Sequence, residues 1–326
     1  MHHFCYKNSI LHAEEINIEK LSSEIGTPFY CYSTATLQRH YEVLCKAFTG
    51  MDYLICYAVK ANSNLSVLAT LAHLGAGMDV VSLGELLRAD KAGVDPKKII
   101  FSGVGKTREE MLYALEKGIL GFNDESEPEL ELLNQAAISL GKKASIALRV
   151  NPDIDAKTHA KISTGKSENK FGISYLEAPR LYERAREMSG ISISGIHMHI
   201  GSQITELEPF HDAFSLMREL VLHLLSRGIT LQYLDIGGGL GVPYRADIET
   251  PPDPFDYARL IKEKLGNLGL KIILEPGRMI AGNAGILVTK VLYVKHTQGR
   301  YFTVVDAGMN DLIRPTLYEA YHDIWP

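Results

Sequence analysis

Short apolar segments alternate with helical segments through the middle of this chain. Eight segments have the apolar run typical of a strand buried on both faces, and seven of them are followed by a helical pattern. Strands that alternate with helices form parallel β-α-β units, and eight such units close more naturally into a (β/α)8 TIM barrel than into an open sheet. We therefore predict an α/β barrel, with a doubly wound open sheet as the alternative. The predicted strands span residues 53–59, 77–82, 99–103, 118–124, 144–150, 192–200, 233–239 and 271–277.

The pattern changes after Gly277. Two strand patterns follow, joined by a short turn at 297–300, and residues 29–33 near the start of the chain are also strand-like. We predict a second, β-rich domain built from residues 1–33 and 281–326, with the barrel between them at 34–280. Two or three strands leave open sheet edges and little core. We therefore expect the C-terminal part of this domain to be incomplete and the chain to be truncated.

Composition excludes several classes of partner. The 326 residues include 34 Lys and Arg against 39 Asp and Glu, a net charge of −5, which gives no reason to expect nucleic acid or an anionic membrane. The four cysteines show no C-x-x-C spacing and suit a reducing compartment. No signal peptide or membrane-spanning run is evident, so we predict a cytoplasmic protein.

Glycine-rich loops follow the seventh and eighth predicted strands, at 237–241 (GGGLG) and 275–285 (EPGRMIAGNAG). Glycines let backbone N–H groups approach an anion closely, and Arg278 can add a bidentate contact. An isolated G-G-G is more often a plain turn, but the loops after these two strands are where barrels often hold phosphate. The sequence therefore predicts a phosphate site here.

Lys60 stands where the first predicted strand, in YLICYAVKANSN (53–64), runs out. A lysine at a barrel rim is usually solvated or ion-paired, but partial desolvation makes an amine a nucleophile toward carbonyls. A reactive lysine and a phosphate site at one barrel mouth suggest pyridoxal phosphate held by Lys60 as a Schiff base.

Other rim groups fit that cofactor. Glu275 could pair with the pyridine nitrogen and keep it protonated, although a salt-bridging role is about as plausible. Of the two histidines in HMH (197–199), one could stack on the ring, although a buried core histidine is the simpler interpretation. No metal site is predicted, because no third ligand or Cys pair has suitable spacing. Asp79, Ser102, Asn123 and Arg149 end other strands and are expected to shape and hydrogen-bond the barrel mouth, with no catalytic role assigned.

The chain resembles the pyridoxal-phosphate decarboxylases of the alanine-racemase-like barrel fold, and within them the diaminopimelate decarboxylase family. The resemblance runs nearly from end to end, and the stretches at 155–173 and 314–322 favour this family over the ornithine and arginine enzymes. The matching stretches are YAVKANSN (57–64), GMDVVSLGEL (77–86), LRVNPDIDAKTHAKISTGKSENKFGI (148–173), HMHIGSQI (197–204), LDIGGGLGVPY (234–244), EPGRMIAGNAG (275–285) and VVDAGMNDLIRPTLYEAYHDI (304–324).

The resemblance implies roles for residues of this chain. Lys60 would carry the cofactor and His199 would stack on its ring as the second catalytic residue. The phosphate and ring nitrogen would be held by Gly238, Gly239, Glu275, Pro276, Gly277 and Arg278. Arg278, Arg314 and Tyr318 would bind the substrate, whose two carboxylates suit two arginines.

The implied activity is pyridoxal-phosphate-dependent decarboxylation of meso-2,6-diaminopimelate to L-lysine and carbon dioxide, the last step of lysine biosynthesis. The resemblance also implies a homodimer with shared active sites. The family's Cys-Glu motif and its late tyrosine have no counterpart in this sequence. Two alternatives therefore stay open: a catalytically impaired or regulatory protein that binds pyridoxal phosphate, and a decarboxylase for a related basic amino acid or carboxynorspermidine.

Overall fold

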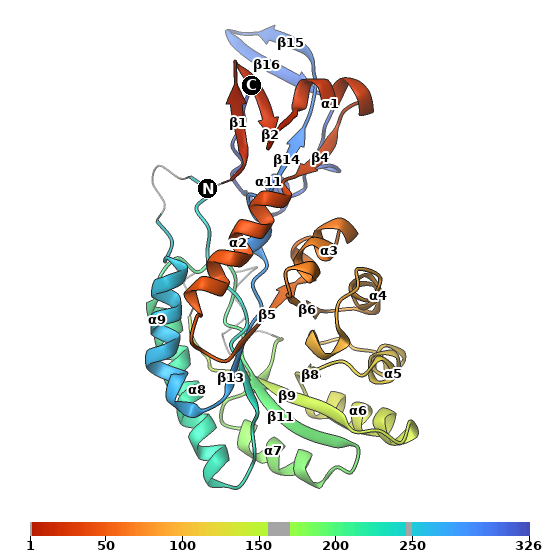
Figure 1. The fold of residues 1–326 in the computed structure, drawn as a ribbon, viewed down its shortest axis with the longest axis vertical. Coiled ribbons are helices and arrows are strands. Elements are labelled where there is room, and N and C mark those ends of the chain that lie inside the picture. The colour runs from red at the N-terminus through yellow and green to blue at the C-terminus, as the bar shows by residue number, and fades with distance from the viewer. Residues whose placement is uncertain (1, 156–169, 246–249) are drawn as a thin grey trace. The chain divides into compact units, whose positions relative to one another are not determined.

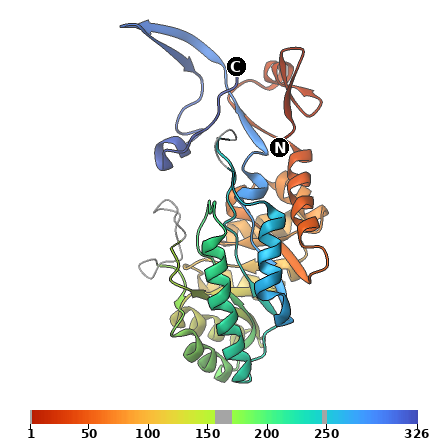
Figure 2. The same cartoon turned by 90° about the vertical axis from the view of Figure 1, so that its left-hand side faces the viewer.

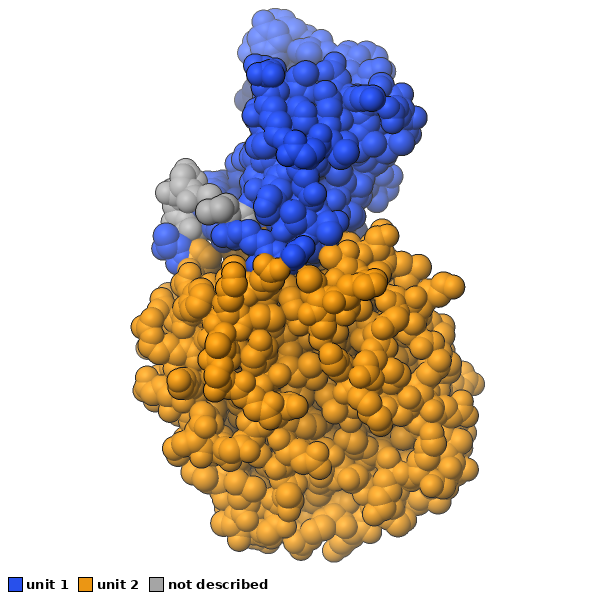
Figure 3. Space-filling view, in the orientation of Figure 1, with its two compact units in different colours: residues 1–39, 243–250, 281–326 blue, residues 40–242, 251–280 orange. Residues whose placement is uncertain are grey.

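A computed structural model describes residues 2–155, 170–245 and 250–326. The chain divides into two compact units, coloured separately in Figure 3. The larger unit comprises residues 40–242 and 251–280, and the smaller comprises 1–39, 243–250 and 281–326. The domain limits expected from the sequence, 33/34 and 280/281, stay a prediction.

The larger unit is a closed parallel barrel with helices outside it (Figure 1). β13 pairs with β5 and β8 pairs with β9, so neither end of the eight-strand ladder is left open. This closure confirms the predicted (β/α)8 fold and rules out the open sheet. The short strand β10 (Ile173–Ser174), which was not predicted, adds to β9 outside the ladder. The barrel strands are β5 (Tyr53–Ala58), β6 (Gly77–Val80), β7 (Ile99–Phe101), β8 (Gly121–Asp124), β9 (Ala144–Asn151), β11 (Ile191–His197), β12 (Tyr233–Asp235) and β13 (Lys271–Leu274).

Side-chain caps begin most of the barrel helices. Thr107 and Glu110 form a reciprocal capping box at the start of α5, as the Thr followed by an acid three residues later predicts. The neighbouring helices α8 and α9, which run side by side in Figure 2, are joined by a hydrogen bond from Arg218 Nη1 to the carbonyl of Lys264 at 2.9 Å. The helices are α2 (Thr34–Ala47), α3 (Leu65–His73), α4 (Leu83–Lys91), α5 (Arg108–Lys117), α6 (Glu127–Ser139), α7 (Ala178–Glu187), α8 (Glu208–Ser226), α9 (Pro254–Leu265) and α10 (Arg278–Ala281), with 3-10 turns η1 (Val59–Ala61), η2 (Pro96–Lys98) and η3 (Gly266–Leu268).

An apolar layer fills the barrel below its mouth. Tyr233 is its largest member, and it fits because two of the facing strand residues are glycines. A Cβ on Gly195 would lie 2.2 Å from the Tyr233 ring, and one on Gly121 would lie 2.9 Å from its hydroxyl. The layer is therefore a packed core, and chemistry is confined to the level above it. Its buried members are Cys56, Ile100, Ala147, Tyr233 and Ile273.

The smaller unit is β-rich and contains more strands than the sequence suggested. The predicted hairpin exists as β15 and β16, and the predicted strand at 29–33 exists as β4, which pairs with β14. The antiparallel sheet β1–β2–β3 was not predicted from the sequence. The elements are β1 (Phe4–Lys7), β2 (Ile10–Ala13), β3 (Ile16–Asn17), α1 (Ile18–Ile25), β4 (Phe29–Tyr32), β14 (Gly285–Val288), β15 (Val291–Thr297), β16 (Arg300–Val305) and α11 (Arg314–Tyr318).

No helix in the described residues combines the length and apolar character needed to cross a membrane.

Candidate active site

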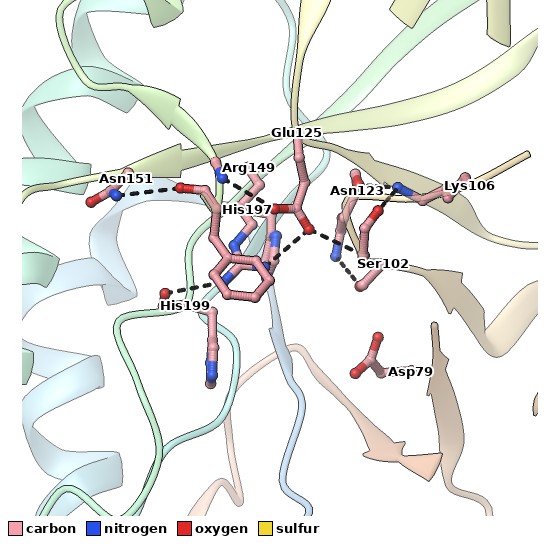
Figure 4. Close-up of polar contacts among 12 residues, drawn as sticks. Asp79, Ser102, Lys106, Asn123, Glu125, Arg149, Asn151, His197 and His199 are labelled. Atoms are coloured by element: carbon pink, nitrogen blue, oxygen red, sulfur yellow. Dashed lines mark hydrogen bonds and ion pairs between the residues drawn. The ribbon is translucent and has the colours of Figure 1, made fainter. Parts of the chain in front are cut away.

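A polar side chain lies within two residues of the C-terminal end of each of the eight barrel strands. Figure 4 labels five of them: Asp79, Ser102, Asn123, Arg149 and His197. These side chains form a layer above the apolar one, at the mouth where barrels carry their active sites. Most of them are almost fully buried, so their charges interact strongly. In strand order from β5 to β13 they are Lys60, Asp79, Ser102, Asn123, Arg149, His197, Asp235 and Glu275.

Lys60 lies in the 3-10 turn η1, two residues beyond the end of β5. Its Nζ is 2.6 Å from Oδ2 of Asp79, whose side chain is fully buried while that of Lys60 is 51% exposed. Desolvation by itself would lower the pKa of Lys60, but the charges of Asp79 and Glu275 raise it above its ordinary value. The amine is thus accessible at the mouth and held beside a buried carboxylate.

The pKa of Asp79 is subject to opposing effects. Burial and the nearby charge of Glu275 raise the pKa of Asp79, and the ion pair with Lys60 only partly offsets them. Asp79 was expected to shape and hydrogen-bond the barrel mouth, and the partner that the structure gives it is the proposed nucleophile, Lys60.

Glu275 directly follows β13 and is surrounded by donors. Oε1 accepts hydrogen bonds from Asn123 Nδ2 at 3.2 Å and from Ser102 Oγ at 3.4 Å, and Oε2 lies 3.4 Å from His197 Nε2. Burial by itself would raise the pKa of Glu275, but the contact with His197 and the charge of Lys60 lower it well below its ordinary value. Glu275 is therefore a carboxylate that stays ionised although it is buried.

Asp235 is the second carboxylate of this group. Its Oδ1 accepts the Gly237 N–H at 3.0 Å, and its Oδ2 lies 3.3 Å from Asn123 Nδ2. Burial and the charge of Glu275 raise the pKa of Asp235 well above its ordinary value, so the neutral acid is favoured. His197, Asp235 and Glu275 lie within 4.8 Å of one another, a gathering of metal-ligating residue types that the sequence analysis did not foresee.

His199 is not on a strand, although the sequence analysis placed it on one. β11 ends at His197, and His199 lies in the following loop, where its Nδ1 accepts the backbone N–H of Gly238 at 3.2 Å. Burial lowers the pKa of His199 far below its ordinary value, and the charges of Arg149 and Lys60 add to that effect. The imidazole is thus neutral, with the proton on Nε2, and could stack on an aromatic ring.

The predicted glycine loops are packed against one another. A Cβ on Gly238 would lie 2.3 Å from the carbonyl oxygen of Glu275, so only glycine permits this approach. The carbonyl of Pro276 accepts the Ala58 N–H at 3.1 Å, which ties the second loop to the end of β5. Within the described residues the amides of Gly239 and Gly277 donate no hydrogen bond, so both can donate to an anion.

A second ionic group flanks the mouth on the side of β8 and β9 (Figure 4). Arg149 pairs with Glu125 at 3.0 Å, and Glu125 also accepts the backbone N–H groups of Gly103 and Gly172, each at 3.1 Å. Lys106 is fully buried, pairs with Glu129 and donates to the carbonyls of Gly103 and Asn123 at 2.8 and 2.7 Å. These contacts hold the loops after β7, β8 and β9 in place.

The three residues expected to bind substrate are divided between the units. Arg278 begins α10 in the larger unit, whereas Arg314 and Tyr318 lie on α11 in the smaller unit. Arg314 Nη2 donates to the Tyr244 hydroxyl at 2.9 Å, and its guanidinium lies 5.3 Å from the centre of the Tyr318 ring. Residues 156–169, most of a stretch used for the family resemblance, fall outside the described residues.

The donor set of the barrel mouth fits pyridoxal phosphate. It offers an accessible amine for the aldehyde at Lys60, an ionised carboxylate for the pyridine nitrogen at Glu275, and a flat neutral ring at His199. The glycine loops supply the amides that a phosphate requires. The sequence analysis did not assign roles to His197 and Asp235, because a buried strand residue gives no sign of which partners closure of the barrel will bring to it.

Comparison with known proteins gives a consistent result. Residues 34–282 match the pyridoxal-binding domain of the pyridoxal-dependent decarboxylases. The diaminopimelate decarboxylase of Pseudomonas aeruginosa is 52% identical over 98% of this chain and 77% of its own length, and that of Haemophilus influenzae is 53% identical over 99% and 78%. The crystal structure of the Helicobacter pylori diaminopimelate decarboxylase, complexed with L-lysine, is 46% identical with a TM-score of 0.91, covering 94% of this chain and 77% of that one.

Proposed function

This chain belongs to the pyridoxal-dependent decarboxylase family, and we infer from that premise that it decarboxylates meso-2,6-diaminopimelate to L-lysine and carbon dioxide. The observation that carries this inference is the identity of about half of all residues with curated diaminopimelate decarboxylases along nearly the whole chain. The reaction replaces one carboxylate by a proton and is the last step of lysine biosynthesis.

Pyridoxal phosphate supplies, when bound, the electron sink that accepts the pair left by the departing carbon dioxide. We assign Lys60 to hold it through its aldehyde, because this amine is accessible at the barrel mouth. Glu275 would pair with the pyridine nitrogen, His199 would pack against the ring, and the loops of Gly238–Gly239 and Pro276–Arg278 would bind the phosphate.

The substrate carries two carboxylates and two ammonium groups. We assign Arg278, Arg314 and Tyr318 to its recognition, since a guanidinium binds a carboxylate through two parallel hydrogen bonds. This assignment rests on the family resemblance and on the chemical match, and it favours diaminopimelate over diamino acids with one carboxylate.

We further propose a cytoplasmic homodimer with shared active sites. The four cysteines, all unpaired in the structure, suit a reducing compartment. The proposed domains are a cofactor-binding barrel at 34–280 and a β domain from residues 1–33 and 281–326.

The activity can be tested by incubating the purified chain with pyridoxal phosphate and meso-diaminopimelate, while L-lysine and released carbon dioxide are quantified. We expect equimolar products, which disappear in Lys60→Ala. L-Lysine, L-ornithine and carboxynorspermidine are assayed separately as alternative substrates. Faster release of carbon dioxide from one of them would transfer the assignment to that substrate.

A chain that binds pyridoxal phosphate but releases no carbon dioxide from any of the four compounds would refute the proposal. It would support the alternative of a non-catalytic cofactor-binding protein.

A further inference from the structure

We propose that His197 is a positioning residue for this reaction: together with Asn123 and Ser102 it fixes Glu275 as an ionised, oriented partner for the pyridine nitrogen of the cofactor. This inference rests on the proposed function, in which Glu275 faces that nitrogen. It gives a role to the one histidine of the HMH motif that the family resemblance left unassigned.

Both carboxylate oxygens of Glu275 contact side chains from other strands of the barrel. His197 Nε2 lies 3.4 Å from Oε2, while Asn123 and Ser102 donate to Oε1 at 3.2 and 3.4 Å. These partners come from the ends of three different strands, so the carboxylate cannot rotate without losing one of them. A carboxylate has about four lone-pair sites, so acceptor capacity remains for one further donor.

The charges of the group also favour a single ionised carboxylate. Asp235 and Glu275 lie close together in a buried site, and two adjacent carboxylates rarely ionise together. His197 is a basic side chain in contact with Glu275, whereas Asp235 is held by the Gly237 N–H and by Asn123. The negative charge therefore stays on Glu275. The other charged and titratable groups that interact with Glu275 are Lys60, Asp79, His199 and the buried thiol of Cys56.

A carboxylate in this state keeps a pyridine nitrogen protonated, and a protonated ring is the stronger electron sink. Loss of the imidazole would leave a buried carboxylate with less compensation. Glu275 would then take up a proton more readily and would hold the ring nitrogen less well.

The test is the ¹⁵N chemical shift of pyridoxal phosphate labelled at its ring nitrogen and bound to the holoenzyme. The variants are Glu275→Gln, His197→Gln, the double variant, and His223→Gln as a matched control on the exposed side of α8. We expect a protonated ring nitrogen in the parent and control, and a displacement toward the unprotonated value in both single variants. The double variant should move no further than Glu275→Gln, because His197 acts through Glu275.

The kinetic counterpart is a fall in kcat for His197→Gln of roughly tenfold to a hundredfold, by analogy with the loss of groups that orient metal ligands. KM should change little, since His197 does not touch substrate. A fall in kcat with the ring-nitrogen shift unchanged would mean a merely structural role and would overturn the proposal. So would a tightly bound stoichiometric metal ion that is lost in His197→Gln.

The same measurements separate failure of the proposed role of Glu275 from failure of the proposed role of His197. If Glu275→Gln leaves the ring-nitrogen shift unchanged, the role of Glu275 itself fails, whatever His197 does. If His197→Gln does not fold, His197→Asn and the ¹⁵N signals of the His197 ring in the parent and in Glu275→Gln replace it. An unchanged His197 ring signal in Glu275→Gln would then refute the contact.

Discussion

The amine of Lys60 and the carboxylate of Asp79 approach to 2.6 Å, with the carboxylate sealed from solvent and the lysine side chain half exposed. The two residues are 19 positions apart in the sequence and meet because β5 and β6 are adjacent parallel strands, in which Ala58 pairs with Asp79. The lysine proposed to react with an aldehyde is therefore held beside a negative charge.

This pairing predicts the effect of Asp79→Asn. Asp79 raises the pKa of Lys60, so its replacement by a neutral amide should lower that pKa and leave more neutral amine at a given pH. The pH at which an amine-selective reagent labels half of Lys60 should fall relative to the parent protein. Lys60→Ala identifies the labelled site, and Asp95→Asn, which alters an exposed acid, should behave as the parent does. An unchanged midpoint in Asp79→Asn would contradict the prediction.

Asp124 predicts a pH-dependent loss of stability. It is fully buried, neither of its oxygens has a hydrogen-bond partner among the described residues, and burial and the charge of Glu129 raise the pKa of Asp124 well above its ordinary value. The folded state then binds a proton more tightly than the unfolded state. This contribution to stability is complete at low pH and is lost as the pH rises from the unfolded pKa of about 4 through the folded pKa.

Asp124→Asn should remove that dependence. Urea unfolding of both proteins from pH 4.5 upward measures this effect. The free energy of unfolding of the variant minus that of the parent should become more positive as the pH rises. A constant difference between the two proteins across this range would show that Asp124 does not titrate as the structure indicates. Asp95→Asn again supplies the control.

The burial of Lys106 predicts that its replacement causes a large loss of stability. Its ammonium is fully buried, pairs with Glu129 and donates to two backbone carbonyls. Lys106→Ala leaves a buried carboxylate without its cation, which typically costs about 3–5 kcal/mol in the free energy of unfolding. Lys117→Ala is the matched control, because the pair of Lys117 with Asp90 is solvent-exposed and should contribute little. Equal effects in the two variants, measured by urea unfolding, would refute the distinction.

The close packing of Gly195 against Tyr233 predicts that a larger residue at position 195 lowers the free energy of unfolding. A Cβ there would lie 2.2 Å from the Tyr233 ring, so Gly195→Ala forces the ring or the strand to move, at a cost of about 1–3 kcal/mol. Gly266→Ala is the control, since its nearest neighbour would be a flexible Lys262 side-chain carbon at 3.5 Å. The double variant Gly195→Ala/Tyr233→Phe should recover little, because the clash involves ring carbons. A Gly195→Ala protein as stable as the parent would show that the layer can relax.

The barrel itself could be predicted from the sequence. Eight apolar runs alternating with helical patterns leave few ways to bury every strand, and the capping residues of α5 mark their helix locally. Lys60 and the glycine loops could also be recognised, because a lysine at the end of a buried strand and a run of glycines stand out in a linear pattern. The strands of the smaller unit were harder: β1, β2 and β3 are four, four and two residues long and show no clear alternation.

The amino-acid order by itself determined the barrel and the elements that carry the reactive groups, because hydrophobic periodicity and backbone preferences act between neighbours in the chain. Only the tertiary structure decided which groups meet. Pairing of the neighbouring strands β11, β12 and β13 brings His197, Asp235 and Glu275 to within 4.8 Å, and pairing of β5 with β6 sets Asp79 against Lys60. Closure of the barrel adds Asn123 and Ser102, which reach Glu275 from β8 and β7. Their protonation depends on burial and on charges distant in the sequence, and both arise only when the chain has folded.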